Sequence, residues 1–126
     1  MTHYLDVEDL MALVDDLGVG PVRDVGLLDS AAHRPSSWIL GQESYEGLDL
    51  KAAVLLHAIV ANYPLVVVDG NKRLGWLAVA VFYQINGVIL DAPDDPAYNL
   101  VISVADGSDD PSTVATSLAE WTRPAR

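Results

Sequence analysis

The sequence has no cysteine, and its seven lysine and arginine residues face 18 aspartate and glutamate residues. The absence of cysteine excludes disulfides, thiolate metal ligands and a cysteine nucleophile, and it fits a reducing compartment such as the cytoplasm. A formal net charge of −11 argues against nucleic acid as a direct partner, because phosphate backbones are bound by lysine and arginine. The composition favours a protein partner instead.

Long hydrophobic runs are also missing, although 51% of the residues are hydrophobic. The longest, at 52–56 and 76–83, fall far short of the ~20 residues that a membrane span needs. The N-terminal stretch carries carboxylates where a signal peptide has basic residues. We therefore expect a cytoplasmic protein with no membrane association.

The length and the spacing of apolar residues predict a single all-α domain over residues 1–126. We expect a compact bundle of about six helices with a short loop or hairpin near residues 36–47. Caps, glycines and prolines place the helices at 7–17, within 23–34, and at 51–62, 72–86, 97–105 and 113–121, with a frayed tail at 122–126. The helix at 51–62 is apolar nearly all round, which indicates a buried central element.

A dense polar segment, Asp69-Gly70-Asn71-Lys72-Arg73, stands directly before the second long apolar helix. Asp69 or Asn71 could simply cap that helix. A cap does not explain the two cations, because positive charge in a first turn opposes the helix dipole. An anion bound at the helix N-terminus would remove this conflict, and Asp69 beside phosphates has the character of a Mg²⁺ ligand.

The segment "VDGNKRLGW", placed between two buried helices, resembles the active-site loop of the Fic/Doc superfamily, His-Pro-Phe-x-[Asp/Glu]-Gly-Asn-[Gly/Lys]-Arg. The lysine at position 72 resembles the Doc branch, the death-on-curing toxins. "RDVGLLDSAAHRP", "KAAVLLHAIVANYP" and "YNLVISVADG" are similar to that branch in order and spacing, so the resemblance spans about residues 4–121.

The resemblance implies a site that binds ATP with Mg²⁺. It places Asp69 on the Mg²⁺, Gly70 and Asn71 in an anion pocket, and Lys72 and Arg73 on phosphate oxygens. Fic relatives transfer AMP to a protein hydroxyl, whereas Doc-type toxins transfer a phosphoryl group to a threonine of elongation factor Tu and stop translation. A Phd-like antitoxin neutralises such toxins by laying a helical segment over their groove.

The histidine that serves as general base in the family is missing here. The alignment that keeps the X-Pro helix end matches Tyr63-Pro64-Leu65 to His-Pro-Phe and treats two residues of "VVV" as an insertion; an alignment without gaps puts Leu65 in the place of the histidine. A tyrosine, with a pKa near 10, accepts a proton poorly at pH 7. We therefore expect impaired transfer, and we expect one or two valines of Val66–Val68 to fill the cleft or bulge into it.

Two further predictions concern side chains outside this segment. Trp38 and Tyr45 fall where Fic relatives carry the flap that binds the target peptide, although a structural role in covering the core is an equal alternative. His57, on the apolar helix before the loop, is interpreted as a hydrogen-bonded core residue.

Three functional hypotheses remain open on the sequence alone. The first is a Doc-like toxin acting as a protein kinase with weakened activity. The second is a catalytically inactive relative that binds a nucleotide or an antitoxin. The third is a plain helical interaction module in which "DGNKR" only begins a helix.

Overall fold

The computed structural model describes residues 1–125. Six α-helices make up most of it, joined by one 3₁₀ turn and two short antiparallel strand pairs, in agreement with the predicted all-α fold. In chain order the elements are α1 (Val7–Leu17), α2 (Val25–His33), η1 (Arg34–Ser36), β1 (Trp38–Ile39), β2 (Gln42–Glu43), α3 (Leu48–Asn62), α4 (Val68–Ile85), β3 (Val88–Leu90), α5 (Asp94–Ala105), α6 (Pro111–Glu120) and β4 (Thr122–Pro124).

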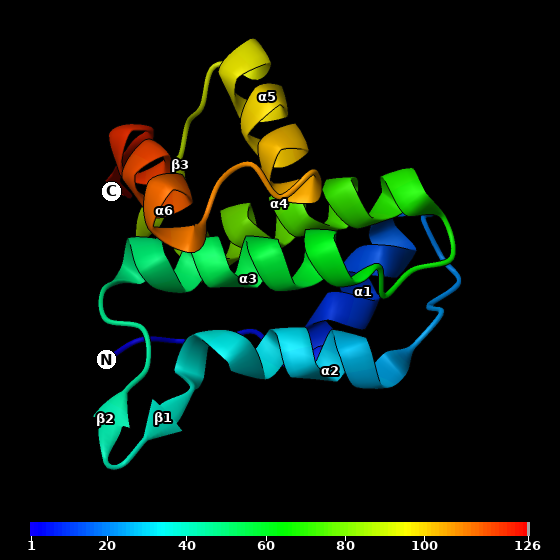
Figure 1. The fold of residues 1–126 in the computed structure, drawn as a ribbon, viewed down its shortest axis with the longest axis horizontal. Helices are drawn as coiled ribbons and strands as arrows, with labels where there is room; N and C mark the ends of the chain where they lie inside the picture. The colour runs from blue at the N-terminus through cyan, green and yellow to red at the C-terminus, as the bar shows by residue number, and fades with distance from the viewer. Residues whose placement is uncertain (126) are drawn as a thin grey trace.

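Helix α3 is the centre of the fold. Nine of its 15 residues are buried, as its uniformly apolar sequence predicts, and it contacts α2, α4, α5 and α6. In Figure 1, α3 and α4 run side by side through the middle, with α1 and α2 on one side and α5 and α6 on the other. The core is therefore built around α3, and the α3–α4 loop is fixed at one end of it.

The helix ends follow from the chemistry that the sequence suggests. The carboxylate of Asp6 accepts a hydrogen bond from the Asp9 N–H, and Asp9 returns one to the Asp6 N–H, which makes a capping box for α1. Gly18 closes α1 in the left-handed conformation, with φ of 66°. Asp24 and Asp110 cap α2 and α6 through the N–H groups of Leu27 and Thr113.

Several boundaries differ from the prediction: α3 and α5 each begin three residues early, at Leu48 and Asp94, and α6 begins two residues early, at Pro111. Helix α4 begins at Val68, four residues before the expected start, so Asn71 lies inside the first turn and not at its beginning. The C-terminal tail is not frayed: β4 pairs with β3 through residues 88–90 and 122–124. Pairing between segments so distant in sequence leaves no local pattern, which is why the prediction was wrong there.

The expected hairpin is present as β1 and β2, joined by a turn at Leu40 and Gly41. It extends away from the helices beside the N-terminal end of α3 (Figure 1). Among the residues that the structure describes, none of the helices has both the length and the apolar character needed to cross a bilayer.

Candidate functional site

The loop between α3 and α4 consists of residues 63–67 and carries the segment that resembles the family motif. Its first residue, Tyr63, ends α3 in the left-handed conformation with φ of 52°, which is uncommon for a residue with a side chain. Leu65 then forms a β-bridge with Val22, and the Val66 N–H donates to the Pro21 carbonyl. The loop is therefore held against the segment that connects α1 to α2.

The three valines do not fill a cleft, so that expectation was wrong. Val66, Val67 and Val68 are exposed to 54%, 45% and 58% of their surface. The extra length is taken up by the early start of α4 at Val68 and by the bridge from Leu65 to Val22. The chain thereby keeps the valines outside the core and outside the groove described below.

Asn71 and Gly70 are buried and serve the backbone of the loop. The Asn71 Oδ1 accepts the Leu65 N–H at 2.9 Å, and its Nδ2 donates to the Val68 carbonyl at 3.2 Å. A Cβ on Gly70 would lie 2.9 Å from the Val19 Cβ, so a side chain there would force the segments apart. The Asn71 side chain is thus engaged in fixing the loop, and Gly70 permits close packing of α4 against Val19.

The cations of the described chain divide into two groups. Four of them have partners. Arg23 donates to main-chain carbonyls, and Arg34 donates to the Tyr45 hydroxyl. Lys51 binds the Tyr45 carbonyl and Glu43, and Arg123 pairs with Asp91. Within residues 1–125, Lys72 and Arg73 make no salt bridge and no side-chain hydrogen bond. Two unpaired cations in a chain of net charge −11 indicate a site for a negatively charged group.

Both cations line a groove of about 640 Å³ between α4 and α5, to which Leu17 of α1 also contributes. Asp69 lies at the same end as Lys72 and Arg73. The rest of the lining is largely apolar and comes from α4, from α5 and from the connection before α5, namely Trp76, Leu77, Ala80, Ala92, Asp94, Ala97, Tyr98, Val101 and Ile102. The groove therefore combines a charged end with an apolar length.

The charged end has the donors that phosphate needs. Helix α4 has no side-chain N-cap, and the first N–H groups of this helix find no acceptor among residues 1–125. Uncapped N–H groups, the helix dipole and two cations together favour an anion. Within the described residues no cluster of three or more histidine, aspartate or glutamate side chains could hold a metal. Two carboxylates, Asp69 and Asp94, line the groove, and Asp69 is the one that lies within a turn of both cations on α4.

The structure does not bring all the predicted site residues together. Tyr63 is 40% exposed and does not line the groove that contains Asp69, Lys72 and Arg73. Trp38 and Tyr45 lie beside the other end of α3, a helix about 22 Å long. Figure 1 shows this separation between the hairpin and the α3–α4 loop.

The hairpin region is anchored by a buried lysine. Lys51, on the first turns of α3, is 2% exposed; its Nζ donates to the Tyr45 carbonyl and lies 3.4 Å from the Glu43 carboxylate. The Tyr45 hydroxyl accepts a hydrogen bond from Arg34 Nε at 2.9 Å. Trp38, in contrast, is 61% exposed, so it is available to a partner while Tyr45 serves the local structure.

The interpretation of His57 as a hydrogen-bonded core residue needs correction. The ring is largely buried on α3, but its buried Nδ1 has no hydrogen-bond partner among the described residues. A sequence pattern cannot show whether a buried ring nitrogen meets an acceptor, because the acceptor comes from another element.

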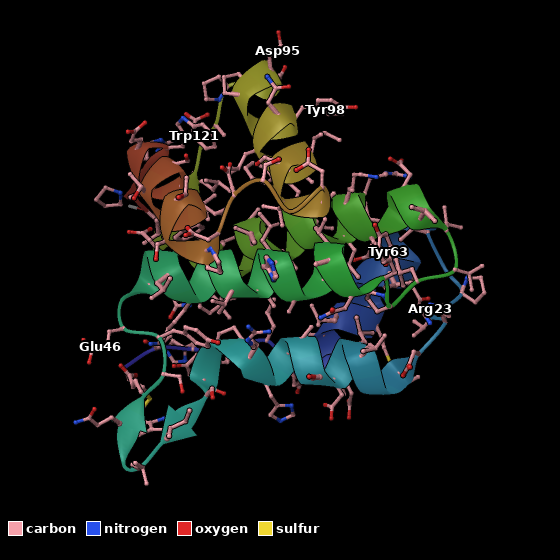
Figure 2. All side chains as sticks on the ribbon, in the orientation of Figure 1. Arg23, Glu46, Tyr63, Asp95, Tyr98 and Trp121 are labelled. Carbon is pink, nitrogen blue, oxygen red and sulfur yellow. The ribbon has the colours of Figure 1, made fainter. Side chains whose placement is uncertain are left out.

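Arg23 is a residue of this region that no sequence motif singles out. It lies between α1 and α2, 40 residues before Tyr63, and its guanidinium donates to the carbonyls of Asn62 and Tyr63. Figure 2 shows Arg23 and Tyr63 at the same end of the molecule. The only sequence signal is its place in the stretch "RDVGLLDSAAHRP".

Comparison with known proteins finds relatives whose similarity to this chain includes the α3–α4 loop. A model of the Fic/DOC family matches residues 4–83 of the chain, a range that includes the α3–α4 loop and most of α4. A protein of Mycolicibacterium smegmatis named Toxin Doc is 42% identical over 124 residues, which cover 94% of this chain and 93% of the relative.

Proposed function

The chain belongs to the Fic/DOC family, and from this premise we propose that it is a Doc-like toxin of a toxin–antitoxin pair. Its chemistry is ATP-dependent phosphoryl transfer to elongation factor Tu in the cytoplasm, which blocks translation. The observation that supports this most directly is the set of Lys72, Arg73 and Asp69 at the uncapped start of α4.

In this proposal Lys72, Arg73 and the first N–H groups of α4 bind the phosphates, and Asp69 holds the Mg²⁺ that the nucleotide carries. A Mg²⁺ held by Asp69 would supply positive charge beside the transferred group. A threonine hydroxyl oxygen of the target bonds to the γ-phosphorus as the bond to the ADP oxygen breaks, and the hydroxyl proton must pass to a base. Positioning supplies most of the catalysis in such reactions, so the phosphate-binding residues are central.

Tyr63 is the reason to expect weak activity. A phenol is a far weaker base than the imidazole that it replaces, so it takes up a proton poorly. Tyr63 also lies outside the lining of the groove, which further weakens its ability to act as the base. A catalytically inactive protein that binds a nucleotide or an antitoxin is therefore the second candidate function.

The groove also suits the antitoxin that a toxin requires. Its apolar length between α4 and α5 fits the apolar face of a helix, and the two unpaired cations at one end fit carboxylates on that helix. We infer a Phd-like antitoxin whose acidic amphipathic segment occupies the groove and covers Lys72 and Arg73.

Expression in a bacterial host tests the toxin proposal. The unchanged protein should slow growth weakly, and Tyr63→His should slow it more strongly, because an imidazole supplies a base at pH 7. Adding Lys72→Ala and Arg73→Ala to Tyr63→His should remove the effect. If neither the unchanged protein nor Tyr63→His slows growth while both accumulate in folded form, the toxin proposal is contradicted.

A further inference from the structure

Among the described residues, Arg23 and Asn71 are the two side chains from outside the loop that hydrogen-bond its main chain. The Nε of Arg23 lies 2.8 Å from the Tyr63 carbonyl oxygen, and its Nη2 lies 3.1 Å from the Asn62 carbonyl oxygen and also donates to Tyr63. The guanidinium thus binds two carbonyls at the C-terminal end of α3. A cation is favourable there, because the last carbonyls of a helix lack internal partners and carry partial negative charge.

These bonds act at the point where the chain leaves α3 in an uncommon conformation. Tyr63 has φ of 52° without being glycine, and a residue keeps such a backbone only where its surroundings hold it. The carbonyl that Arg23 binds twice belongs to this same residue. Arg23 therefore contributes to fixing the direction in which the loop departs.

The main chain around Arg23 continues the contact along the loop. The N–H groups of Arg23 and Asp24 both donate to the Pro64 carbonyl, at 2.7 and 3.1 Å. The next residue of the loop, Leu65, forms a β-bridge with Val22, and the Pro21 carbonyl accepts the Val66 N–H at 3.2 Å. The segment from Pro21 to Asp24 thus supports residues 62–66 from one side, while Asn71 binds Leu65 from the other.

We propose that Arg23 is a positioning residue of the site: by holding the carbonyls of Asn62 and Tyr63 it sets the loop that places the uncapped start of α4, with Asp69, Lys72 and Arg73, at the groove. The proposal rests on the proposed function in that the site is taken to bind nucleotide phosphates. Arg23 does not line the groove, and its Nε and Nη2 donate to main-chain carbonyls.

A purely structural role would predict something different. If Arg23 only stabilises the C-terminus of α3, its removal would lower the melting temperature of the whole protein. Amide exchange in the loop and the response to nucleotide would then change only as much as that general loss of stability requires. A positioning residue predicts a local change: the loop loosens, and the ligand response falls, under conditions where the core remains folded.

The test compares Arg23→Ala and Arg23→Lys with a control, Arg123→Ala, which removes an exposed arginine paired with Asp91 away from the loop. Two quantities are measured well below each melting temperature: amide hydrogen exchange at Leu65 and Val66, and the rise in melting temperature on adding Mg·ATP. Arg23→Ala should speed exchange at these two amides at least tenfold, leave the amides of Leu55 and Leu56 unchanged, and reduce the Mg·ATP rise to less than half.

Arg23→Lys keeps a donor that can reach the same carbonyls, so it should restore part of both effects, and Arg123→Ala should match the unchanged protein. The proposal is overturned if exchange at Leu65 and Val66 is unaltered, or if it increases only as much as exchange in α3. If the unchanged protein shows no rise with Mg·ATP, nucleotide binding in the proposed function fails, and the exchange rates still decide the role of Arg23.

Discussion

Tyr83 shows how a single buried polar side chain can contribute to stability. It lies on α4 with its ring fully buried, and its hydroxyl donates to the Asp49 carboxylate of α3 at 2.7 Å. Burial, and then the hydrogen bond and the negative charge of Asp49, raise the pKa of this phenol far above its ordinary value near 10.

This shift predicts a loss of stability at alkaline pH. A group whose pKa is raised in the folded state contributes stability that is present below the unfolded pKa and is lost as pH rises beyond it. The contribution from Tyr83 should therefore decline above about pH 10, where the unfolded chain ionises and the folded chain does not. Tyr83→Phe should make the melting temperature fall less steeply over this range.

At pH 7 the same substitution should cost about 1 kcal/mol, the usual net value of a hydrogen bond. Tyr98→Phe is the matched control, because the Tyr98 side chain is exposed on α5 (Figure 2). Removing its hydroxyl should change neither the stability at pH 7 nor the fall in melting temperature at alkaline pH. Equal alkaline slopes for Tyr83→Phe and the unchanged protein would contradict the assignment of the titration to Tyr83.

At the level of elements, the contact between α3 and α4 depends on a close approach at Gly75. A Cβ on Gly75 would lie 2.7 Å from the Val60 Cγ2 and 3.1 Å from the Leu56 Cδ1, both on α3. Real Cβ atoms do not tolerate the shorter distance, so Gly75→Ala must push the helices apart or displace Val60. Forcing additional atoms into a packed core typically costs 1–3 kcal/mol.

We therefore expect Gly75→Ala to lower the free energy of unfolding by about 2 kcal/mol, measured by urea denaturation. Val60→Ala removes the methyl group in closest contact, so the double variant should lose less than the sum of the two single losses. Strict additivity would show that the close approach at Gly75 is not what limits the packing.

The elements differ in how well the sequence predicts them. Helices α1, α3 and α6 follow from local signals, such as the carboxylate of Asp6, the apolar run of α3 and Asp110 before Pro111. The start of α4 does not, because no side chain caps it and the loop is fixed by Asn71 from within the helix. The β3–β4 pairing joins segments more than 30 residues apart and has no local signature.

The candidate site likewise has a part that the sequence predicts and a part that only folding creates. The segment from Asp69 to Arg73 is contiguous, so its composition alone pointed to an anion site. The groove wall from α5, the contact of Gly70 with Val19 and the bonds from Arg23 are made by parts of the chain that meet only through folding. The exposure of the three valines likewise depended on how the extra loop length was absorbed, which the sequence could not decide.

At the scale of the whole molecule, the cations within residues 1–125 fall into two sets: the partnered ones stabilise the fold, and the unpartnered Lys72 and Arg73 line the groove. With a net charge of −11, the surface as a whole repels a free nucleotide, and the groove end must overcome this repulsion locally. Mg²⁺ reduces the charge of the nucleotide and so favours its approach. Nucleotide binding should consequently weaken without Mg²⁺.

The central claim is that this chain retains the phosphate-binding half of a Doc-like site and lacks the base. The most direct measurement is phosphate transfer from Mg·ATP to purified elongation factor Tu, followed by mass spectrometry, for the unchanged protein and for Tyr63→His. We predict little or no phosphothreonine with the unchanged protein and clear modification with the altered protein, abolished by Lys72→Ala with Arg73→Ala. Rapid modification by the unchanged protein, or none by a folded altered protein, would contradict the account.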